Sequence, residues 1–390
     1  MEEGPAGSSI TEITEGETRL LVPSGALAGE APPRNVAFFN PRAESNRDTS
    51  VAAYAAFLEE FEGPRTMLEP LSGVGARGLR AANETGMLQH AFLNDANPNA
   101  VALAEGSAQL NWQEHKRMIS FSNGEACRFL LSGHAAGGQR GAIVDVDPFG
   151  SPAPFFDCAV RAVTHNGMIS CTATDLQVLN GLFDAACRNR YGGTPIRGTT
   201  YGSETSIRMV LGCLRTVAAR LGASIRPLLI EADMHYYRVY ARVSARHADD
   251  ARSEMGYSMH CDACGRRRLT THVTARCDAC GSGARSAGPL WRGPLFDAAF
   301  VGSTVQRMSR MSAGKRARRR LETAAEESAV QAGLFYTVDE MAARTGSSPP
   351  RIGRVVSDLR KAGFAASRTS LAPTGFRTDA PLTAISRVFS

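Results

Sequence analysis

At the centre of this sequence lies Ala142-Ile-Val-Asp-Val-Asp147-Pro-Phe-Gly150-Ser-Pro152, in which an apolar run leads into an acidic turn. The apolar residues predict a buried parallel strand, and the proline and glycine predict its end. The Asp147 carboxylate and the Pro148 carbonyl can each accept a hydrogen bond from the amino group of a flat base, and Phe149 can stack on the ring. Ligands of open α/β sheets bind at this edge, so the segment is a candidate catalytic site; an ordinary strand-end turn is the alternative.

Strand and helix patterns alternate between Thr66 and Val243. The expected strands cover residues 66–69, 91–93, 119–121, 142–144 and 167–171, and a long helix is expected over 203–221. Two further apolar strands, 225–230 and 236–243, lie so close in sequence that they should pair antiparallel. This alternation, with a terminal antiparallel pair, predicts a doubly wound α/β sheet.

The composition is that of a globular protein. The chain has 390 residues, of which 43% are hydrophobic and 21% charged, and its length predicts two or three domains. No apolar run approaches the roughly 18 residues of a membrane span, so no membrane partner is expected. A net charge of +6 and a pI near 8.9 allow an anionic partner without requiring one.

Cysteine usage bears on the cellular compartment. Nine cysteines are present, and five of them lie in apolar or helical stretches: Cys127, Cys158, Cys171, Cys187 and Cys213. This odd number and scattered placement predict buried free thiols in a reducing compartment. We therefore expect a cytoplasmic protein.

Glycines and acidic residues mark the ends of the first three expected strands. Gly73-x-Gly75-x-x-Gly78 follows the first strand, with the spacing of a loop that cradles a nucleotide. Glu69 precedes this loop and can hold a positively charged ligand amine, while Asp95 ends the second strand, where ribose hydroxyls bind. Glu125 follows the third strand, near the expected position of an adenine amino group. Each could instead be a turn residue or a helix cap, but the three together favour S-adenosylmethionine over a dinucleotide.

Six short motifs are more specific than the strand pattern. They are Phe39-Asn-Pro-Arg42, Asn46-Arg-Asp48, Gly75-Ala-Arg-Gly-Leu-Arg80, Asn94-Asp95, Asp145-Val-Asp-Pro-Phe-Gly-Ser-Pro152 and Thr172-Ala-Thr-Asp175. Together they closely resemble the motifs of the archaeal and eukaryotic tRNA N2,N2-dimethylguanosine methyltransferases. The resemblance runs from about Phe38 to the C-terminus and is strongest in the part that ends near Val243.

The resemblance implies the class I, Rossmann-like sheet of an S-adenosylmethionine-dependent methyltransferase of the archaeal type. Such an enzyme transfers one and then two methyl groups to N2 of a guanine in tRNA, at position 26. The matching donor-binding positions are Arg47, Arg77, Asp95, Glu125 and Ala126. Phe38 and Phe149 match the aromatic residues expected to sandwich the guanine. One departure is Glu125 itself, because many relatives carry the shorter aspartate there.

The chemistry of such a transfer fits the acidic turn. The sulfonium donor is already activated, so alignment is the main requirement, and guanine N2 is a weak nucleophile. Asp147 and the Pro148 carbonyl can draw its hydrogens and carry charge as the new bond forms, so both are candidate catalytic groups with Phe149. Once methylated, the nitrogen loses a proton easily, so Asp147 need be only a modest base. Asp145 could assist, cap a helix or bind an arginine.

Four cysteines form two pairs after Val243. Cys261-x-x-Cys264 and Cys277-x-x-Cys280 are separated by twelve residues, and a glycine follows each pair, as in a zinc ribbon. We predict a structural zinc ion held by all four thiolates, which would replace the hydrophobic core that this region lacks. Disulfides or redox-active pairs are the alternatives.

A basic run and a helix-helix-hairpin pattern characterise the C-terminal part. Lys315–Arg320 carries five cations, for which Arg316 and Arg319 are the candidate phosphate contacts; a solvated helix surface is the alternative. Helical patterns then lead to a loop through Pro373-Thr-Gly375, which resembles a winged helix. The expected organisation is an arm (1–35), a methyltransferase domain (36–243), a zinc-ribbon-like module (244–292) and an α+β, winged-helix-like tRNA-binding domain (293–390).

Two other functions compete with the tRNA methyltransferase. A DNA adenine or cytosine amino-methyltransferase commonly uses Asp-Pro-Pro-Tyr rather than the Asp-Pro-Phe-Gly found here. A DNA-binding regulator could combine the zinc ribbon and winged helix with a vestigial sheet domain, but the intact Gly-rich loop argues against decay. We expect tRNA as the partner and favour a monomer.

Overall fold

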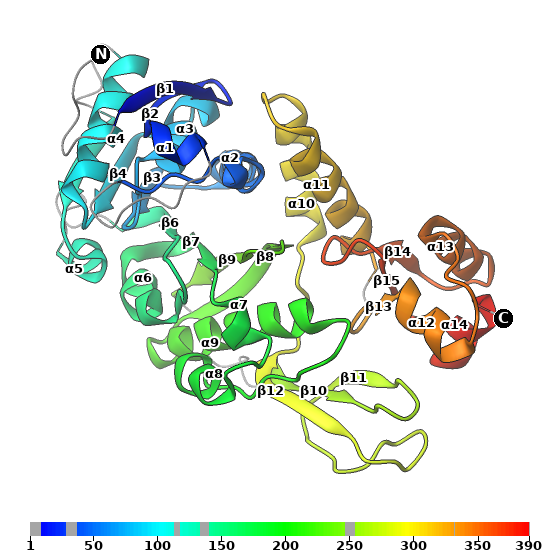
Figure 1. Cartoon of the computed structure of the whole chain (residues 1–390). Coiled ribbons are helices and arrows are strands. Elements are labelled where there is room, and N and C mark those ends of the chain that lie inside the picture. Colours follow the sequence, from blue (N-terminus) through cyan, green and yellow to red (C-terminus); the bar gives the residue numbers. More distant parts are fainter. Residues whose placement is uncertain are drawn as a thin grey trace.

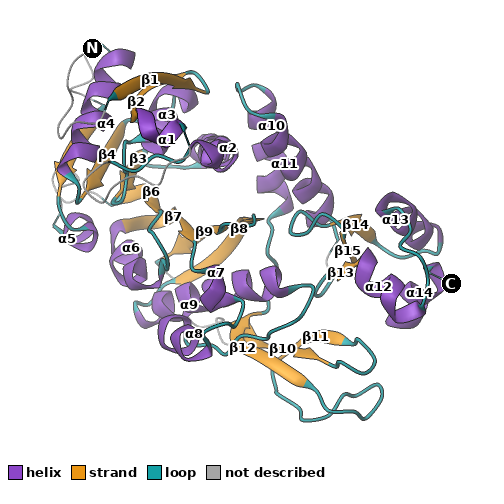
Figure 2. Cartoon of the chain, in the orientation of Figure 1, coloured by secondary structure: helices purple, strands orange, loops and turns teal. Residues whose placement is uncertain are grey.

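The computed structural model describes residues 9–28, 37–112, 118–132, 140–245, 254–330 and 332–389. Its centre is a seven-stranded sheet with the order β5-β4-β3-β6-β7-β9-β8 (Figures 1 and 2). The strands are β3 (Thr66–Glu69), β4 (His90–Asp95), β5 (Ile119–Asn123), β6 (Gly141–Val146), β7 (Val163–Ala173), β8 (Ser224–Ala232) and β9 (Tyr237–Ser244). The first five are parallel, whereas β9 runs antiparallel to both β7 and β8. The predicted doubly wound sheet and its antiparallel pair are confirmed.

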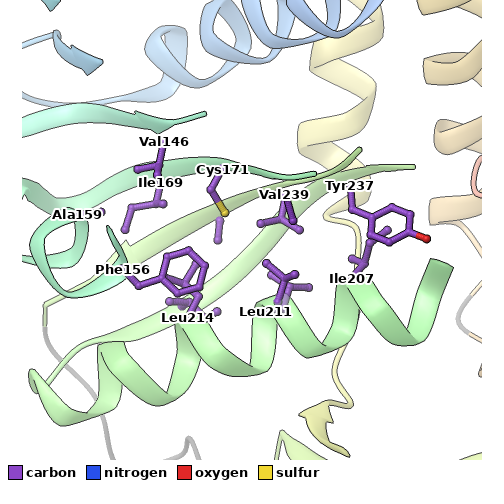
Figure 3. Close-up of a cluster of buried hydrophobic side chains, with 14 of the residues drawn as sticks. Val146, Phe156, Ala159, Ile169, Cys171, Ile207, Leu211, Leu214, Tyr237 and Val239 are labelled. Atoms are coloured by element: carbon purple, nitrogen blue, oxygen red, sulfur yellow. The ribbon is translucent and has the colours of Figure 1, made fainter. Parts of the chain in front are cut away.

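Helices cover both faces of this sheet. They are α2 (Glu44–Glu60), α3 (Ala76–Thr85), α4 (Pro98–Asn111), α5 (Ala126–Leu131), α6 (Phe156–Ala162), α7 (Leu176–Leu179), α8 (Asp184–Tyr191) and α9 (Gly202–Arg220). Buried side chains of α2, α3 and α4 share one hydrophobic core, and those of α5, α6 and α9 share the other. Figure 3 shows Ile207, Leu211 and Leu214 of α9 facing the sheet. Both sheet faces are therefore buried, which explains the continuous apolar runs of the strands.

The N-terminal segment forms a hairpin of β1 (Ile10–Glu15) and β2 (Thr18–Pro23), followed by α1 (Ser24–Leu27). Leu20 and Val22 are fully buried in the core that contains α3 and α4. Glu15 is buried as well and accepts hydrogen bonds from arginines of α2 and α3. The hairpin is thus attached to the sheet domain by both apolar packing and buried charge.

The cysteine-rich region forms a three-stranded sheet ordered β11-β10-β12, from β10 (Met255–His260), β11 (Arg267–Thr270) and β12 (Arg285–Trp291). Its third strand packs on α9, where Leu290 and Trp291 are almost completely buried. Gly212 permits this approach, because a Cβ there would lie only 3.1 Å from the Leu290 Cα atom. The module therefore has an apolar anchor on the sheet domain, which its sparse large apolar residues had not suggested.

The remaining elements are α10 (Ala298–Ser309), α11 (Lys315–Ser328), β13 (Tyr336–Thr337), α12 (Val338–Thr345), α13 (Ile352–Lys361), β14 (Ala366–Arg368), β15 (Gly375–Thr378) and α14 (Leu382–Val388). Figure 1 shows α10 and α11 between α2 and the C-terminal unit. The helices α12 and α13 followed by the β14–β15 hairpin have the arrangement of a winged helix, with its own buried core. Arg377 of β15 is buried and pairs with Glu204 of α9 and Glu327 of α11.

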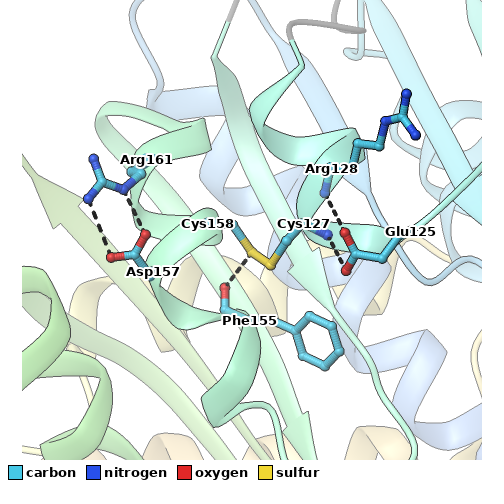
Figure 4. The surroundings of a disulfide bond; sticks show 7 residues. All are labelled: Glu125, Cys127, Arg128, Phe155, Asp157, Cys158 and Arg161. Atoms are coloured by element: carbon cyan, nitrogen blue, oxygen red, sulfur yellow. Dashed lines mark hydrogen bonds and ion pairs between the residues drawn. A yellow bond between two sulfur atoms is a disulfide. The ribbon is translucent and has the colours of Figure 1, made fainter.

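The prediction that the scattered cysteines are free thiols is wrong for two of them. Cys127 and Cys158 form a disulfide whose Cα atoms are 5.4 Å apart (Figure 4). The two residues are separated by 31 positions in sequence, and only the packing of α5 against α6 brings them together. Cys171, Cys187 and Cys213 are free. The expectation of a reducing compartment thus loses two of its five supporting thiols.

Within the described ranges, no helix has the length and apolarity needed to cross a bilayer.

Candidate active site

The acidic residues predicted at strand ends lie along one edge of the sheet. Glu69 ends β3, Asp95 ends β4, and Asp147 directly follows β6. Glu125 follows β5 and precedes α5. Because all four strands are parallel, their carboxyl ends meet at the same edge, and the Gly-rich loop after β3 lies between them. This edge is where open α/β sheets bind ligands.

Asp147 is held by an arginine that the sequence assigned to the donor. Its side chain is 32% exposed, and Arg77 of α3 donates to it through Nη2. Arg77 is itself buried and donates from Nη1 to Asn46 Oδ1 (2.8 Å) and Ser50 Oγ (2.5 Å). Burial alone would raise the pKa of Asp147, but the charges of Arg77 and Arg238 outweigh it and hold the pKa below its usual range. Asp147 is therefore an anion with lone pairs left for a substrate amino group.

Asp145 is the centre of a fully buried polar cluster behind Asp147. Arg238 of β9 and the Tyr54 hydroxyl both donate to Asp145 Oδ2. Arg238 also donates to Ser170 Oγ (2.5 Å) and Thr172 Oγ1 (2.5 Å). Of the three alternatives for Asp145, the structure shows the ion pair with an arginine.

Sequence reasoning missed Arg238 and Tyr54 as parts of this site. A signal existed for Arg238, since it interrupts an apolar strand that was expected to be buried, between Tyr237 and Val239. A buried arginine needs an anionic partner, and Asp145 is that partner. Tyr54 carries no such signal, because a tyrosine on an apolar helix face is ordinary core material.

The two predicted aromatic residues meet at the surface. The rings of Phe38 and Phe149 contact edge to face, with centroids 4.7 Å apart. Phe149 is 78% exposed and Phe38 41% exposed, although large apolar side chains are usually covered. Gly150 supports this loop with a φ of 85° and donates its N–H to Thr174 Oγ1 (2.7 Å). Pro148 is buried beside them. A flat ligand can enter between the rings only if they turn toward parallel.

The Gly-rich loop offers an unsatisfied acceptor. Glu69 is 2% exposed, and within the described chain its Oε2 has no hydrogen-bond partner. A Cβ at position 78 would lie 2.4 Å from that oxygen, so Gly78 allows the loop to pass it. Burial and the charge of Asp145 raise the pKa of Glu69 well above its usual range. A ligand cation at this point would supply the missing partner.

Asp95 and Glu125 already have backbone partners. Asp95 accepts from Gly73 N (2.8 Å) and Asn97 N (2.9 Å), so it fixes the Gly-rich loop against the end of β4. Glu125 is the N-cap of α5 and accepts from Cys127 N (2.9 Å) and Arg128 N (2.7 Å), as Figure 4 shows. These backbone bonds lower the pKa of Glu125. Ala126 begins α5 and is buried.

Arg47 does not join the Asp147 cluster. It donates two hydrogen bonds to Glu15 of the N-terminal hairpin, of 2.6 and 2.5 Å. Its guanidinium also lies over the Phe39 ring, 4.9 Å from the centroid. Contact with a donor molecule would require Arg47 to share or exchange Glu15.

Comparison with known proteins agrees with this geometry. The sequence model of "N2,N2-dimethylguanosine tRNA methyltransferase" matches residues 16–390. The chain belongs to this family. A tRNA (guanine(26)-N(2))-dimethyltransferase of Methanosarcina barkeri is 34% identical over 392 residues, which cover 96% of this chain and 97% of the relative. The corresponding enzyme of Methanothermobacter thermautotrophicus is 32% identical, with 97% and 98% covered.

A solved member of the dimethylguanosine methyltransferase family also has this fold. Trm1 from Pyrococcus horikoshii, in complex with S-adenosyl-L-methionine, superimposes with a TM-score of 0.82 at 27% identity. The similarity covers 97% of this chain and all of that one. The class I methyltransferase fold, together with the C-terminal region that carries the cysteines, is therefore confirmed.

The four cysteines of this family member converge. The sulfur atoms of Cys261, Cys264, Cys277 and Cys280 lie within 4.8 Å of one another. The closest pairs are Cys261–Cys280 at 3.5 Å and Cys264–Cys277 at 3.6 Å. Four sulfur atoms so close in space can complete the tetrahedral shell of a zinc ion, which leaves no coordination position for water.

The basic run divides into structural and exposed residues. Arg318 donates to the carbonyl oxygens of Met308 (2.8 Å), Met311 (2.5 Å) and Ala313 (3.2 Å), which end the α10–α11 connection. Arg320 pairs with Asp233 at 2.6 Å. Lys315, Arg316 and Arg319 are exposed, although Arg316 also reaches Asp233 at 2.7 Å. Only these three residues of the run present their charge to solvent.

Proposed function

We infer that the chain transfers one and then two methyl groups from S-adenosylmethionine to N2 of a guanine in tRNA, at position 26. The carrying observation is an anionic Asp147 beside the exposed Phe38–Phe149 pair, at the sheet edge that also holds the Gly-rich loop. The relatives' names supply the substrate and the position. The family shown by the comparisons disfavours the DNA methyltransferase and the non-enzymatic regulator.

The donor pocket proposed here uses groups on three strand ends. Glu69, whose Oε2 lacks a partner, would bind the donor's amino group, and Asp95 would bind the ribose hydroxyls. The start of α5, with Glu125 and Ala126, would face the adenine. Arg77 and Arg47 are the cations available for the donor carboxylate. The bound donor supplies an electrophilic methyl group on sulfur.

Asp147 and Pro148 would act on the acceptor. Their oxygens accept the two N2 hydrogens, which leaves the nitrogen lone pair pointing at the methyl group. As the N–C bond forms and the sulfonium bond breaks, one N2 proton passes to Asp147 and then to solvent. Phe38 and Phe149 hold the guanine plane and exclude water. Because Asp147 keeps its charge after the first transfer, the same groups can serve the second.

Analysis of the methylated nucleoside tests this function directly. An unmodified tRNA transcript incubated with enzyme and labelled donor should yield labelled N2-methylguanosine and N2,N2-dimethylguanosine on digestion. A transcript with adenosine in place of guanine 26 is the control and should remain unlabelled. Label in adenine or cytosine of DNA, or none in tRNA, would overturn the proposal.

Asp95→Ala is expected to weaken donor binding about 10- to 100-fold, because charged contacts to ribose hydroxyls contribute about 1.5–3 kcal/mol. The change also frees Gly73 N, which loosens the donor loop. Calorimetric titration with S-adenosylmethionine measures the loss, and tRNA affinity should remain within about threefold. Asp157→Ala, at an exposed ion pair on α6, is the matched control. Unchanged donor affinity in folded Asp95→Ala protein would remove this residue from the pocket.

Replacing Lys315 and Arg319 with glutamine is expected to weaken tRNA binding about 10-fold and to lower its salt dependence by about two phosphate contacts. Both side chains are exposed and hold no ion pair within the described residues, so the fold should be unaffected. Arg161→Gln with Arg226→Gln removes the same charge from exposed positions elsewhere and is the control. Filter binding at several salt concentrations measures the slope. An equal loss in the control would reduce the effect to net charge alone.

A further inference from the structure

The turn between β8 and β9, residues 233–236, lies at the active-site edge of the sheet. Tyr237 pairs with Ala173 at the carboxyl end of β7, and Cys171 pairs with Val146 at the end of β6. Asp147 and this turn therefore project from the same edge, two strands apart. Two strand spacings correspond to a lateral distance of roughly 10 Å.

The turn is fixed from both sides. Asp233 accepts from Arg316 (2.7 Å) and Arg320 (2.6 Å) of α11, while its own N–H donates to the Tyr236 carbonyl (2.9 Å). Met234 N donates to Asp233 Oδ1 (2.7 Å), which closes the tip. The exposed side chain at the tip is thus presented by an ordered turn.

Contacts also connect this turn to the catalytic aspartate. The Tyr236 hydroxyl accepts from Arg320 (3.1 Å) and interacts with the Asn46 side chain. Asn46 Oδ1 in turn accepts from Arg77, which pairs with Asp147. The position of the turn is therefore coupled to that of the reacting groups.

Met234 is an apolar side chain in an unusually open position. It is 83% exposed, more than any other large hydrophobic residue of the described chain, and Phe149 follows at 78%. A single exposed apolar residue is common on protein surfaces. Here, however, it stands beside the cations of α11 and on the same edge as the exposed aromatic pair. Such a surface suits stacked bases between phosphates, since apolar side chains enter base steps and cations bind the backbone.

We propose that Met234 enters the tRNA base stack and fills the space that the target guanine leaves when it turns out toward Phe38 and Phe149. This role rests on the proposed function. Guanine N2 is inaccessible inside a stack, so the base must leave it, at a cost of a few kcal/mol. A thioether placed in the gap stacks on the two flanking bases and holds the opened state. Met234 is then a positioning residue, since it acts on the neighbours of the reacting base.

Single-turnover methylation by Met234→Ala tests the proposal. The rate on intact tRNA should fall about 10- to 100-fold, the range expected for loss of one stacking contact, while tRNA affinity changes by less than about threefold. A second tRNA carries an abasic residue opposite the target guanine, which makes turning out easier. On this substrate the deficit of Met234→Ala should shrink to within about threefold. Met234→Leu preserves the bulk and should restore the rate on intact tRNA.

The controls separate this role from other defects. Val273→Ala removes an exposed apolar side chain from the cysteine-rich module and should change neither rate. Wild-type rates for Met234→Ala on intact tRNA would overturn the proposal. Equal losses on both tRNAs, or a loss in Met234→Leu as large as in Met234→Ala, would also overturn it. A wild-type enzyme that methylates neither tRNA is a distinguishable result, which overturns the proposed function and this role with it.

Discussion

Asp147→Asn is expected to slow guanine methylation about 100- to 10,000-fold while donor and tRNA still bind. The asparagine has the same shape, but its NH2 group faces a base hydrogen where the carboxylate accepts one. It also cannot take the proton that N2 releases. Arg77 keeps its bonds to Asn46 and Ser50, so the pocket should retain its form.

Single-turnover assays with labelled donor measure the loss, and calorimetry and filter binding check the two ligands. Asp157→Asn, on the exposed face of α6, is the matched control and should be fully active. The pKa of Asp147 is held below its usual range, so its anion should persist as the pH falls from 7 to about 5. Full activity in Asp147→Asn would show that another group accepts the N2 hydrogens.

The sheet and its active edge could be predicted because they depend on local pattern. Apolar runs of strand length, glycines after β3 and acidic residues after successive strands each reflect a requirement of the backbone or of a ligand near it. Their order along the chain fixes the parallel topology, since a βαβ connection leaves few alternatives. Asp147 and Phe149 were found because proline and glycine flank them in sequence.

The partners within the site could not be predicted, because they depend on tertiary packing. Arg77 contacts Asp147 across 70 positions, and Arg238 contacts Asp145 across 93. No periodicity connects such residues. The same limit hid the Cys127–Cys158 disulfide, which exists because α5 packs on α6.

The basic run shows a further limit of sequence reasoning. Spacing alone cannot tell which cation of Lys315–Arg320 faces solvent. Arg318 and Arg320 turn inward, to backbone carbonyls and to Asp233, and they dock α11 onto the sheet domain. The charge that remains exposed is thereby placed at the active-site edge, so the structural residues of the run determine where the others can act.

Loss of the metal is expected to disorder the cysteine-rich module and to undock the winged helix, while the seven-stranded sheet stays folded. Structural zinc sites contribute about 10–16 kcal/mol of apparent binding free energy, more than a small module can replace. Arg267 of β11 donates to Glu340 and to the Phe335 carbonyl, so disorder in the module removes a contact of the winged helix. Strand β12 should remain in place, because Trp291 is buried in the core against α9.

Cys277→Ser tests this expectation with Cys213→Ser as the control, since Cys213 is a half-buried thiol on α9 outside the cluster. Metal analysis should find one zinc per chain in the wild type and the control, and little in Cys277→Ser. Calorimetry should then show a separate low-temperature transition, and proteolysis should cleave first between β10 and β12 while the sheet domain resists. The two parts separate in this way because the sheet has its own core, whereas the cysteine loops have only their shared metal. Four titratable thiols in metal-free, fully stable native protein would contradict the zinc site.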